Sequence, residues 1–274
     1  MRIGAPDGSL TGSAGVAALA ELIDRLGVVG LLDEHIGPIK ARDRGVTGGQ
    51  LLVAMAQSQL LGGDALVDLD RQRGDAARLL SAVPSPASTT AAGLAGRFGP
   101  AQRAGIEAAI ATLLGRVFRL LPAARRASWS ADPTIDMDST DVEVYGRHKD
   151  GVAYNYCGQR AGRPHLATWA EAGITVAAEL LAGNDDVRPH AAGMLRRALA
   201  AIPEQVSGRP RVRADAGYFT AELAHAAVHA GADFAIAAKR NTAMWRAYAG
   251  IAENQWQPAT GMPGAQVVRV RPHV

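Results

Sequence analysis

The sequence predicts an α+β protein in which a helical N-terminal region is followed by a mixed sheet flanked by helices. Two observations predict this fold class. Up to about residue 122, apolar residues recur at intervals of three and four, which is typical of helices with one buried face. From about residue 131 the interval shortens to two, and strand-like segments then alternate with helical ones. At 274 residues, 48% of them hydrophobic, the chain is large enough to bury a core.

The N-terminal region begins with an amphipathic helix over residues 15–26, which Gly27 and Gly30 are expected to end. A second helix is expected from Thr47, whose hydroxyl can cap the free backbone amides, to a pair of glycines that follows residue 61. Further helices are expected after the turn-rich residues 84–90 and over residues 102–121. Residues 1–122 are therefore expected to form one helical region.

The second region is expected to run strand, strand, strand, helix, strand, helix, strand. Strands are expected over residues 134–140, 166–169, 174–181, 209–214 and 234–238, the last of them buried. Helices are expected over residues 188–201 and 220–230, and residues 147–163 are expected to form a hairpin rich in glycine, tyrosine and basic side chains. Such an alternation indicates a mixed sheet with helices packed on it.

Charge and cysteine content limit the class of protein. The net charge of +3 leans basic, which permits a nucleic-acid partner without requiring one. The single cysteine, Cys157, excludes a disulfide within the chain and cysteine-based zinc sites, and it fits a reducing cytoplasm. No segment has the length of a membrane span, and the first residues lack the apolar core of a signal peptide. We therefore expect a cytoplasmic protein with no membrane partner.

Acidic residues in the second region indicate a site. Asp136 and Asp138, two apart on a predicted strand, point the same way, and burying an unpaired carboxylate costs several kcal/mol. They therefore need a metal, a partner or water; a solvated strand face would explain them equally well. Asp215 stands at the end of another predicted strand, before a glycine turn. If these strands are neighbours, Asp138 and Asp215 could share a divalent cation, and their hard oxygens suit Mg²⁺ or Mn²⁺ better than zinc.

Four blocks of the sequence stand out in this order: residues 136–140 (DMDST), 151–156 (GVAYNY), 162–165 (GRPH) and 213–219 (RADAGYF). Together they closely resemble the DDE transposases of the 1380 group of insertion sequences. The resemblance implies a helical N-terminal part over residues 1–122 and an RNase H-like catalytic domain over residues 129–274. It also implies that the N-terminal helices bind transposon ends or form a homodimer.

The resemblance implies a reaction as well. A two-metal site activates water to cut a DNA phosphodiester, and then activates the freed 3′ hydroxyl to attack target DNA. The family's first aspartate falls on Asp138, with Asp136 as the alternative, and its second falls on Asp215. The expected cofactor is Mg²⁺ or Mn²⁺, and the expected partners are the transposon ends and target DNA.

The family's third acid is where this sequence departs from the pattern. It is a glutamate on a helix beyond the fifth strand, and the sole glutamate after Ala238 is Glu253. Glu253 lies at the start of what resembles an inserted segment, so we assign no third catalytic acid. We expect a sheet that is incomplete at its C-terminus, through truncation or a frameshift, and a chain that is inactive as given. The alternatives are a non-catalytic DNA-binding remnant that regulates transposition, and an RNase H-like nuclease.

Basic and aromatic residues near the predicted hairpin are expected to bind DNA, because cations neutralise phosphates and aromatic rings stack on bases. These residues are Arg147, Lys149, Tyr154, Arg160, Arg163 and His165, joined by Lys239 and Arg240 just beyond the fifth strand. A solvated basic surface is the simpler alternative.

Overall fold

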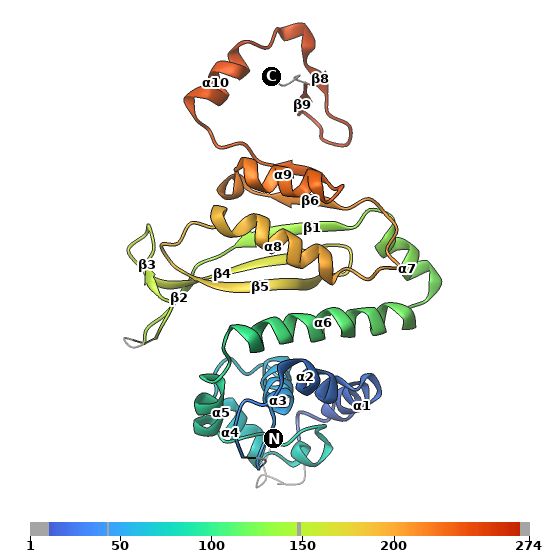
Figure 1. Cartoon of the computed structure of the whole chain (residues 1–274), viewed down its shortest axis with the longest axis vertical. Coiled ribbons are helices and arrows are strands. Elements are labelled where there is room, and N and C mark those ends of the chain that lie inside the picture. The colour runs from blue at the N-terminus through green and yellow to red at the C-terminus, as the bar shows by residue number, and fades with distance from the viewer. Residues whose placement is uncertain (1–10, 43, 147–148, 269–274) are drawn as a thin grey trace, which may run out of the picture.

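The computed structural model describes residues 11–42, 44–146 and 149–268 (Figure 1). Its N-terminal part is helical, as expected. The helices are α1 (Val16–Leu26), α2 (Val28–Ile36), α3 (Gly48–Leu60), α4 (Asp68–Gly74), α5 (Ser88–Ala95), α6 (Pro100–Leu120) and α7 (Ala123–Ser130), with the 3-10 helix η1 (Ala76–Leu80) between α4 and α5.

Local signals in the sequence set the ends of several of these helices. Gly27 has a φ of 63°, a left-handed conformation that glycine adopts without a Cβ clash, and it ends α1 as predicted. Gly30 lies inside α2, so the prediction that it also marks a helix end is wrong. A single glycine costs a helix only about 1 kcal/mol, which packing can offset. The Thr47 hydroxyl accepts the backbone N–H of Gln50 at 3.1 Å and caps α3, as predicted.

The N-terminal helices enclose a hydrophobic core. Its buried side chains include Ile23, Ile36, Leu51, Val53, Leu69, Ala91 and Leu94, which come from α1 to α5. Helix α6 crosses α2 closely at Gly105, where a Cβ atom would lie 2.3 Å from the carbonyl oxygen of His35. Any larger residue at position 105 would therefore push the two helices apart.

Within the described residues, the second part of the chain forms a seven-stranded sheet. Its strands are β1 (Thr134–Ser139), β2 (Val142–Glu143), β3 (Ala153–Tyr154), β4 (Arg160–Trp169), β5 (Ile174–Ala182), β6 (Arg211–Ala214) and β7 (Asp233–Ile236). The main order is β5-β4-β1-β6-β7, and the short strands β2 and β3 also pair with β4. Strand β4 is antiparallel to β1 and β5, whereas β6 and β7 run parallel to β1. The predicted fold class, a mixed sheet after a helical region, is confirmed.

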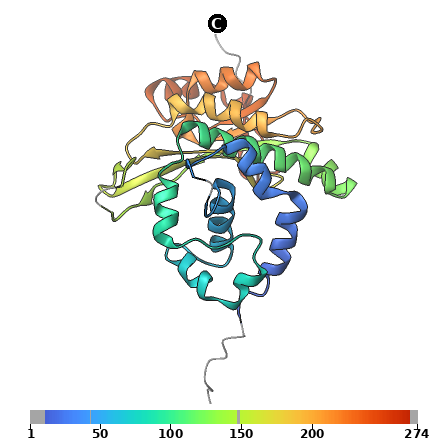
Figure 2. The ribbon, with the colours of Figure 1, turned by 60° about the horizontal axis from the view of Figure 1, so that its bottom comes forward.

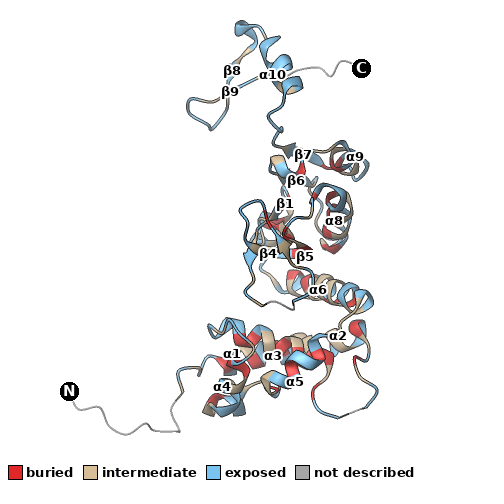
Figure 3. Ribbon diagram, turned by 90° about the vertical axis from the view of Figure 1, so that its left-hand side faces the viewer, coloured by how far each residue is buried: buried red, intermediate tan, exposed pale blue. Residues whose placement is uncertain are grey.

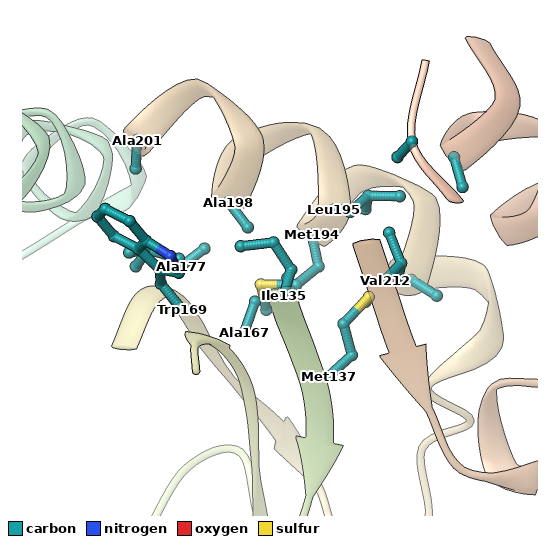
Figure 4. Close-up of a cluster of buried hydrophobic side chains, with 14 of the residues drawn as sticks. Ile135, Met137, Ala167, Trp169, Ala177, Met194, Leu195, Ala198, Ala201 and Val212 are labelled. Atoms are coloured by element: carbon teal, nitrogen blue, oxygen red, sulfur yellow. The ribbon is translucent and has the colours of Figure 1, made fainter. Parts of the chain in front are cut away.

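Helices α8 (Arg188–Ala201) and α9 (Ala221–His229) pack on one face of this sheet (Figure 3). Ile135 and Met137 of β1 point toward α8, where Met194, Leu195 and Ala198 meet them (Figure 4). All five side chains are at least 97% buried. This layer is the larger hydrophobic core of the protein.

The other face of the sheet carries the polar side chains of β1. Because side chains alternate along a strand, Asp136 and Asp138 point away from the face that holds Ile135 and Met137. In Figure 3, α6, α8 and α9 lie on one side of the sheet, and the described residues place no helix on the other. The acidic residues therefore lie on an open face.

Helix α6 connects the two cores. Ile106, near its start, packs against the N-terminal core, whereas Leu114 and Phe118 are buried in the core beneath the sheet. Figures 1 and 2 show α6 between the N-terminal helices and the sheet. The predicted domain boundary near residue 122 stays a prediction. Along the chain, side chains change from the N-terminal core to the core beneath the sheet within α6, before that boundary.

The strands differ from the prediction in two places. Strand β4 begins at Arg160, six residues before the expected start, and so takes in part of the predicted hairpin. Strand β7 was expected to be buried, but it is the exposed edge of the sheet, and Phe234 keeps 45% of its surface. That prediction is wrong, because an apolar run fits an edge strand with one covered face as well as a central one.

The chain continues beyond β7 into the segment that resembles an insertion, for which the sequence analysis predicted no helix or strand. It holds α10 (Thr242–Ala249), the 3-10 helix η3 (Glu253–Gln255), β8 (Gln257–Pro258) and β9 (Gln266–Val267), and α10 has no buried residue. Of the helices described, none is both long and apolar enough to cross a membrane.

Candidate functional site

The two candidate aspartates stand at the ends of neighbouring parallel strands. In the register of β1 and β6, Met137 lies opposite Ala214, so Asp138 and Asp215 follow side by side. Asp215 keeps an extended backbone, with φ −78° and ψ −177°, before the 3-10 helix η2 (Ala216–Tyr218). Adjacent strands are about 4.8 Å apart. A shared cation requires that these two strands be neighbours, and they are.

Each carboxylate of this pair keeps an oxygen free of hydrogen bonds from the described residues. The backbone N–H of Ser139 donates to Oδ1 of Asp138 at 2.8 Å, and that of Gly217 donates to Oδ1 of Asp215 at 2.9 Å. A Cβ at Gly217 would lie 3.0 Å from that Asp215 oxygen, so glycine suits this turn. Neither aspartate forms an ion pair with a described side chain. Two free hard oxygens fit one divalent cation, with water or phosphate completing its coordination.

Asp136, the alternative first aspartate, is engaged elsewhere. Arg213 of β6 grips it with two hydrogen bonds, from Nε to Oδ1 and from Nη2 to Oδ2, both 2.6 Å long. This carboxylate raises the pKa of the Arg213 guanidinium. Both oxygens of Asp136 are therefore engaged by arginine, whereas Asp138 keeps one oxygen that no described residue bonds.

Replacing Asp136 by asparagine is therefore expected to leave divalent-cation binding unchanged. The lost ion pair is about half exposed, with side-chain exposures of 56% for Arg213 and 37% for Asp136. Such pairs stabilise a fold by about 0–1 kcal/mol, so the free energy of unfolding should fall by no more than that. A Mn²⁺ titration of Asp136→Asn checks the assignment, and a loss of Mn²⁺ binding would restore Asp136 as the ligand.

A third acid does not join the pair within the described part of the chain. No group of three or more histidine, cysteine, aspartate or glutamate side chains is arranged there to hold a metal ion. Glu253, which the sequence left unassigned, lies in η3 on the exposed segment after β7.

A buried polar cluster lies beneath the aspartates, and sequence patterns predicted little of it. Tyr218 of η2 is 1% exposed, and its ring centroid lies 5.4 Å from that of His165, which is fully buried. Burial raises the pKa of the Tyr218 phenol; the neighbouring Ser139 side chain lowers it, and the charges of Asp138 and Asp215 raise it further. The Tyr218 phenol is therefore close enough to Asp138 and Asp215 for their charges to act on it.

His165 was predicted to contact DNA, and the structure does not bring it to a surface. Its Nδ1 lies 2.9 Å from Oε1 of Glu179, and burial lowers the pKa of the imidazole against the opposing effect of that carboxylate. The reason is strand geometry: His165 shares the inward face of β4 with Ala167 and Trp169. We therefore leave His165 out of the DNA-facing surface.

Arg163, also predicted to bind DNA, is held at the base of the hairpin. Its Nε donates to Oδ1 of Asp141 at 2.8 Å, and its Nη1 donates to the carbonyl oxygen of Asp185 at 2.6 Å. The hydrogen bond from Arg163 is the main reason that the pKa of Asp141 is lowered, and Asn155 adds a second hydrogen bond. Only 18% of the Arg163 side chain is exposed, and its guanidinium is paired with Asp141. Arg163 therefore stabilises the hairpin and is not free to bind a DNA phosphate.

The other predicted DNA-contacting residues have varied positions. Lys149, Tyr154, Lys239 and Arg240 are exposed, and Tyr154 keeps 69% of its surface. Arg160 donates to the backbone carbonyl oxygens of Gly146 and Lys149, so it supports the loop. Arg147 lies outside the described residues. Strand β7 runs parallel to β1 and β6, so Lys239 and Arg240, which come after β7, lie beyond the same ends of the strands as the two aspartates.

The strand order and the paired carboxylates define the class of protein, an α+β fold of the RNase H-like kind with acids at the ends of adjacent parallel strands. The sequence matches the family described as transposase DDE domain group 1 over residues 2–268, and the chain belongs to this family of transposases.

Two further comparisons add detail. No curated protein matches the sequence. Among solved structures, the chain is similar to a piggyBac transposase in a synaptic complex with hairpin DNA, at 11% identity and a TM-score of 0.31. That match covers 91% of this chain and 53% of the other, so the chain spans about half the length of that transposase.

Proposed function

We propose that this protein is a transposase of the 1380 group of insertion sequences and binds DNA through a divalent-cation site at Asp138 and Asp215. Because the described residues bring no third acid to this site, we expect the chain as given to be inactive in DNA cleavage. The observation that carries the proposal is the parallel register of β1 and β6, which sets these two carboxylates side by side. Their free oxygens and the nearby exposed cations Lys239 and Arg240 support a site that receives a phosphodiester.

The cation would be Mg²⁺ or Mn²⁺, held by Asp138 and Asp215. When bound, such an ion stabilises the charge that develops on a phosphoryl group during cleavage and strand transfer. The residues of the chain supply alignment: the N–H groups of Ser139 and Gly217 each hold one carboxylate oxygen and leave the other toward the ion. Lys239 and Arg240 would neutralise the DNA backbone that approaches this edge.

The test is whether a divalent cation links the protein to DNA through these aspartates. We expect Mn²⁺, added at constant ionic strength, to strengthen binding of linear duplex DNA in a gel-shift titration. Asp138→Asn and Asp215→Asn should each abolish that gain, whereas Asp136→Asn, whose carboxylate is held by Arg213, should keep it. A gain that persists in Asp138→Asn and Asp215→Asn would rule out the site.

The exposed cations near the site predict the salt dependence of DNA binding. Replacing Lys149, Lys239 or Arg240 by glutamine should reduce the slope of log K against log [salt] by about 0.9 for each phosphate that the variant no longer neutralises. Arg209→Gln is the matched control. Arg209 pairs with Asp233 where β6 and β7 begin, at the opposite ends of these strands from Lys239 and Arg240. Equal slopes for the control and the three variants would show that these cations do not face DNA.

A further inference from the structure

Two buried polar atoms beneath the aspartates have no hydrogen-bond partner among the described residues: Nε2 of His165 and the hydroxyl of Tyr218. His165 is fully buried and Tyr218 is 1% exposed. An unsatisfied buried polar group destabilises a fold, and such groups are rare in folded proteins. Two of them in adjacent rings call for a role that offsets this cost.

The two atoms are chemically complementary. The Glu179 carboxylate can only accept, so Nδ1 of His165 carries the ring hydrogen and donates to it. Nε2 of the neutral ring is then an acceptor, while the Tyr218 hydroxyl is a donor. The ring centroids are 5.4 Å apart with planes inclined by 40°, so the donor and the acceptor belong to two rings that are in contact.

The pair lies directly under the proposed metal ligands. In the register of β1 and β4, His165 is opposite Ser139, the residue that follows Asp138. Tyr218 closes the turn that begins with Asp215, and its phenol lies close to the Ser139 side chain. One ring therefore supports the end of β1 and the other supports the end of β6.

The support continues to helix α8. Glu179 of β5, which holds His165, also lies 3.3 Å from Nδ1 of His190 and 3.3 Å from Nη1 of Arg197, both on α8. Nε of Arg197 is in turn 3.1 Å from Oε2 of Glu107 on α6. A continuous line of polar contacts thus runs from two helices across β5 and β4 to the rings under the aspartates.

We propose that His165 and Tyr218 are positioning residues, which fix the ends of β1 and β6 so that Asp138 and Asp215 can hold one divalent cation. This inference rests on the proposed function of the two aspartates. Neither ring contacts the ion, and both act through the strand ends.

Tyr218→Phe tests the role of the hydroxyl, because it keeps the ring and removes one oxygen. We expect the Mn²⁺ affinity of the full chain, measured by electron paramagnetic resonance of the free ion, to fall about 10-fold, as for outer-shell partners of metal ligands. The melting temperature without metal should stay the same or rise, because a buried unsatisfied hydroxyl is removed. A purely structural role would give no loss of affinity at unchanged stability.

The histidine is tested by a pair of variants. His165→Leu removes both ring nitrogens, whereas His165→Gln retains an amide near the position of Nε2, so Gln should restore part of the Mn²⁺ affinity that Leu loses. Tyr145→Phe is the matched control, because the Tyr145 hydroxyl is at the surface and bonds Glu143 at 2.9 Å. This control should bind Mn²⁺ as the unaltered chain does.

The outcomes separate this inference from the proposed function. Mn²⁺ binding that is lost in Asp138→Asn but unchanged in Tyr218→Phe would overturn the positioning role and leave the site standing. An unaltered chain that binds no Mn²⁺ would overturn both. A Tyr218→Phe protein with weaker Mn²⁺ binding and undiminished thermal stability supports the inference.

Discussion

Replacing either Asp138 or Asp215 by asparagine is expected to lower the affinity for Mn²⁺ by about 100-fold or more, since loss of outer-shell partners alone costs 10–100-fold. Each aspartate offers one carboxylate oxygen that the described residues leave free, and the two stand side by side at the ends of β1 and β6. The experiment is a Mn²⁺ titration followed by electron paramagnetic resonance, with Mg²⁺ as competitor.

Stability gives a second readout for the same variants. Two neighbouring carboxylates repel each other when no cation lies between them, so losing one should not lower the melting temperature of the metal-free protein. The rise in melting temperature that Mn²⁺ produces should disappear, because a ligand stabilises only the state that binds it. If Asp138→Asn unfolds the metal-free protein, the residue has a structural role that this site does not explain.

Replacing Trp169 by alanine is expected to destabilise the fold by about 3–5 kcal/mol, the usual cost of removing a large aromatic side chain from a core. Trp169 of β4 is fully buried, and its ring lies 5.4 Å from Trp129 on α7 and 6.3 Å from Phe118 on α6. These three rings join the sheet to the helices that precede it. Denaturant unfolding followed by circular dichroism measures the loss.

Two variants test the reason for this effect. Trp169→Phe should cost much less than Trp169→Ala, because it keeps a ring and removes an indole N–H that has no partner among the described residues. Trp245→Ala, at a position with 53% exposure on α10, should cost about 1 kcal/mol or less. A loss as small for Trp169→Ala as for Trp245→Ala would show that the three rings do not stabilise the core.

The paired aspartates were predictable because they follow from short-range rules. Alternation along β1 places Asp136 and Asp138 on one face, and Asp215 precedes a glycine turn at the end of a strand. The choice between Asp136 and Asp138 depends on long-range structure, because Arg213 is 77 residues from Asp136 in sequence and reaches it only through the pairing of β1 with β6. The sequence favoured Asp138 by resemblance, and the ion pair supplies a physical reason.

The buried cluster could not be predicted as readily. His165 was placed on a basic surface because the residues before it look like a hairpin, yet alternation back from Trp169 would have set it on the inward face. Tyr218 gives no such signal: it follows a glycine turn, and only the packing of η2 against β4 shows that it is buried. Side chains that act through long-range packing are the ones that local patterns miss.

Helix α6 has a consequence for how such chains exchange parts. Its 21 residues, about 30 Å in length, give one end to the N-terminal core and the other to the core beneath the sheet. If related chains recombined before α6, its first turns would come from one parent and the N-terminal core that they pack against from the other; recombination after α6 would do the same at the core beneath the sheet. A junction inside α6, between Ile106 and Leu114, would leave each core with the part of the helix that packs on it, so we expect exchange to be tolerated best there.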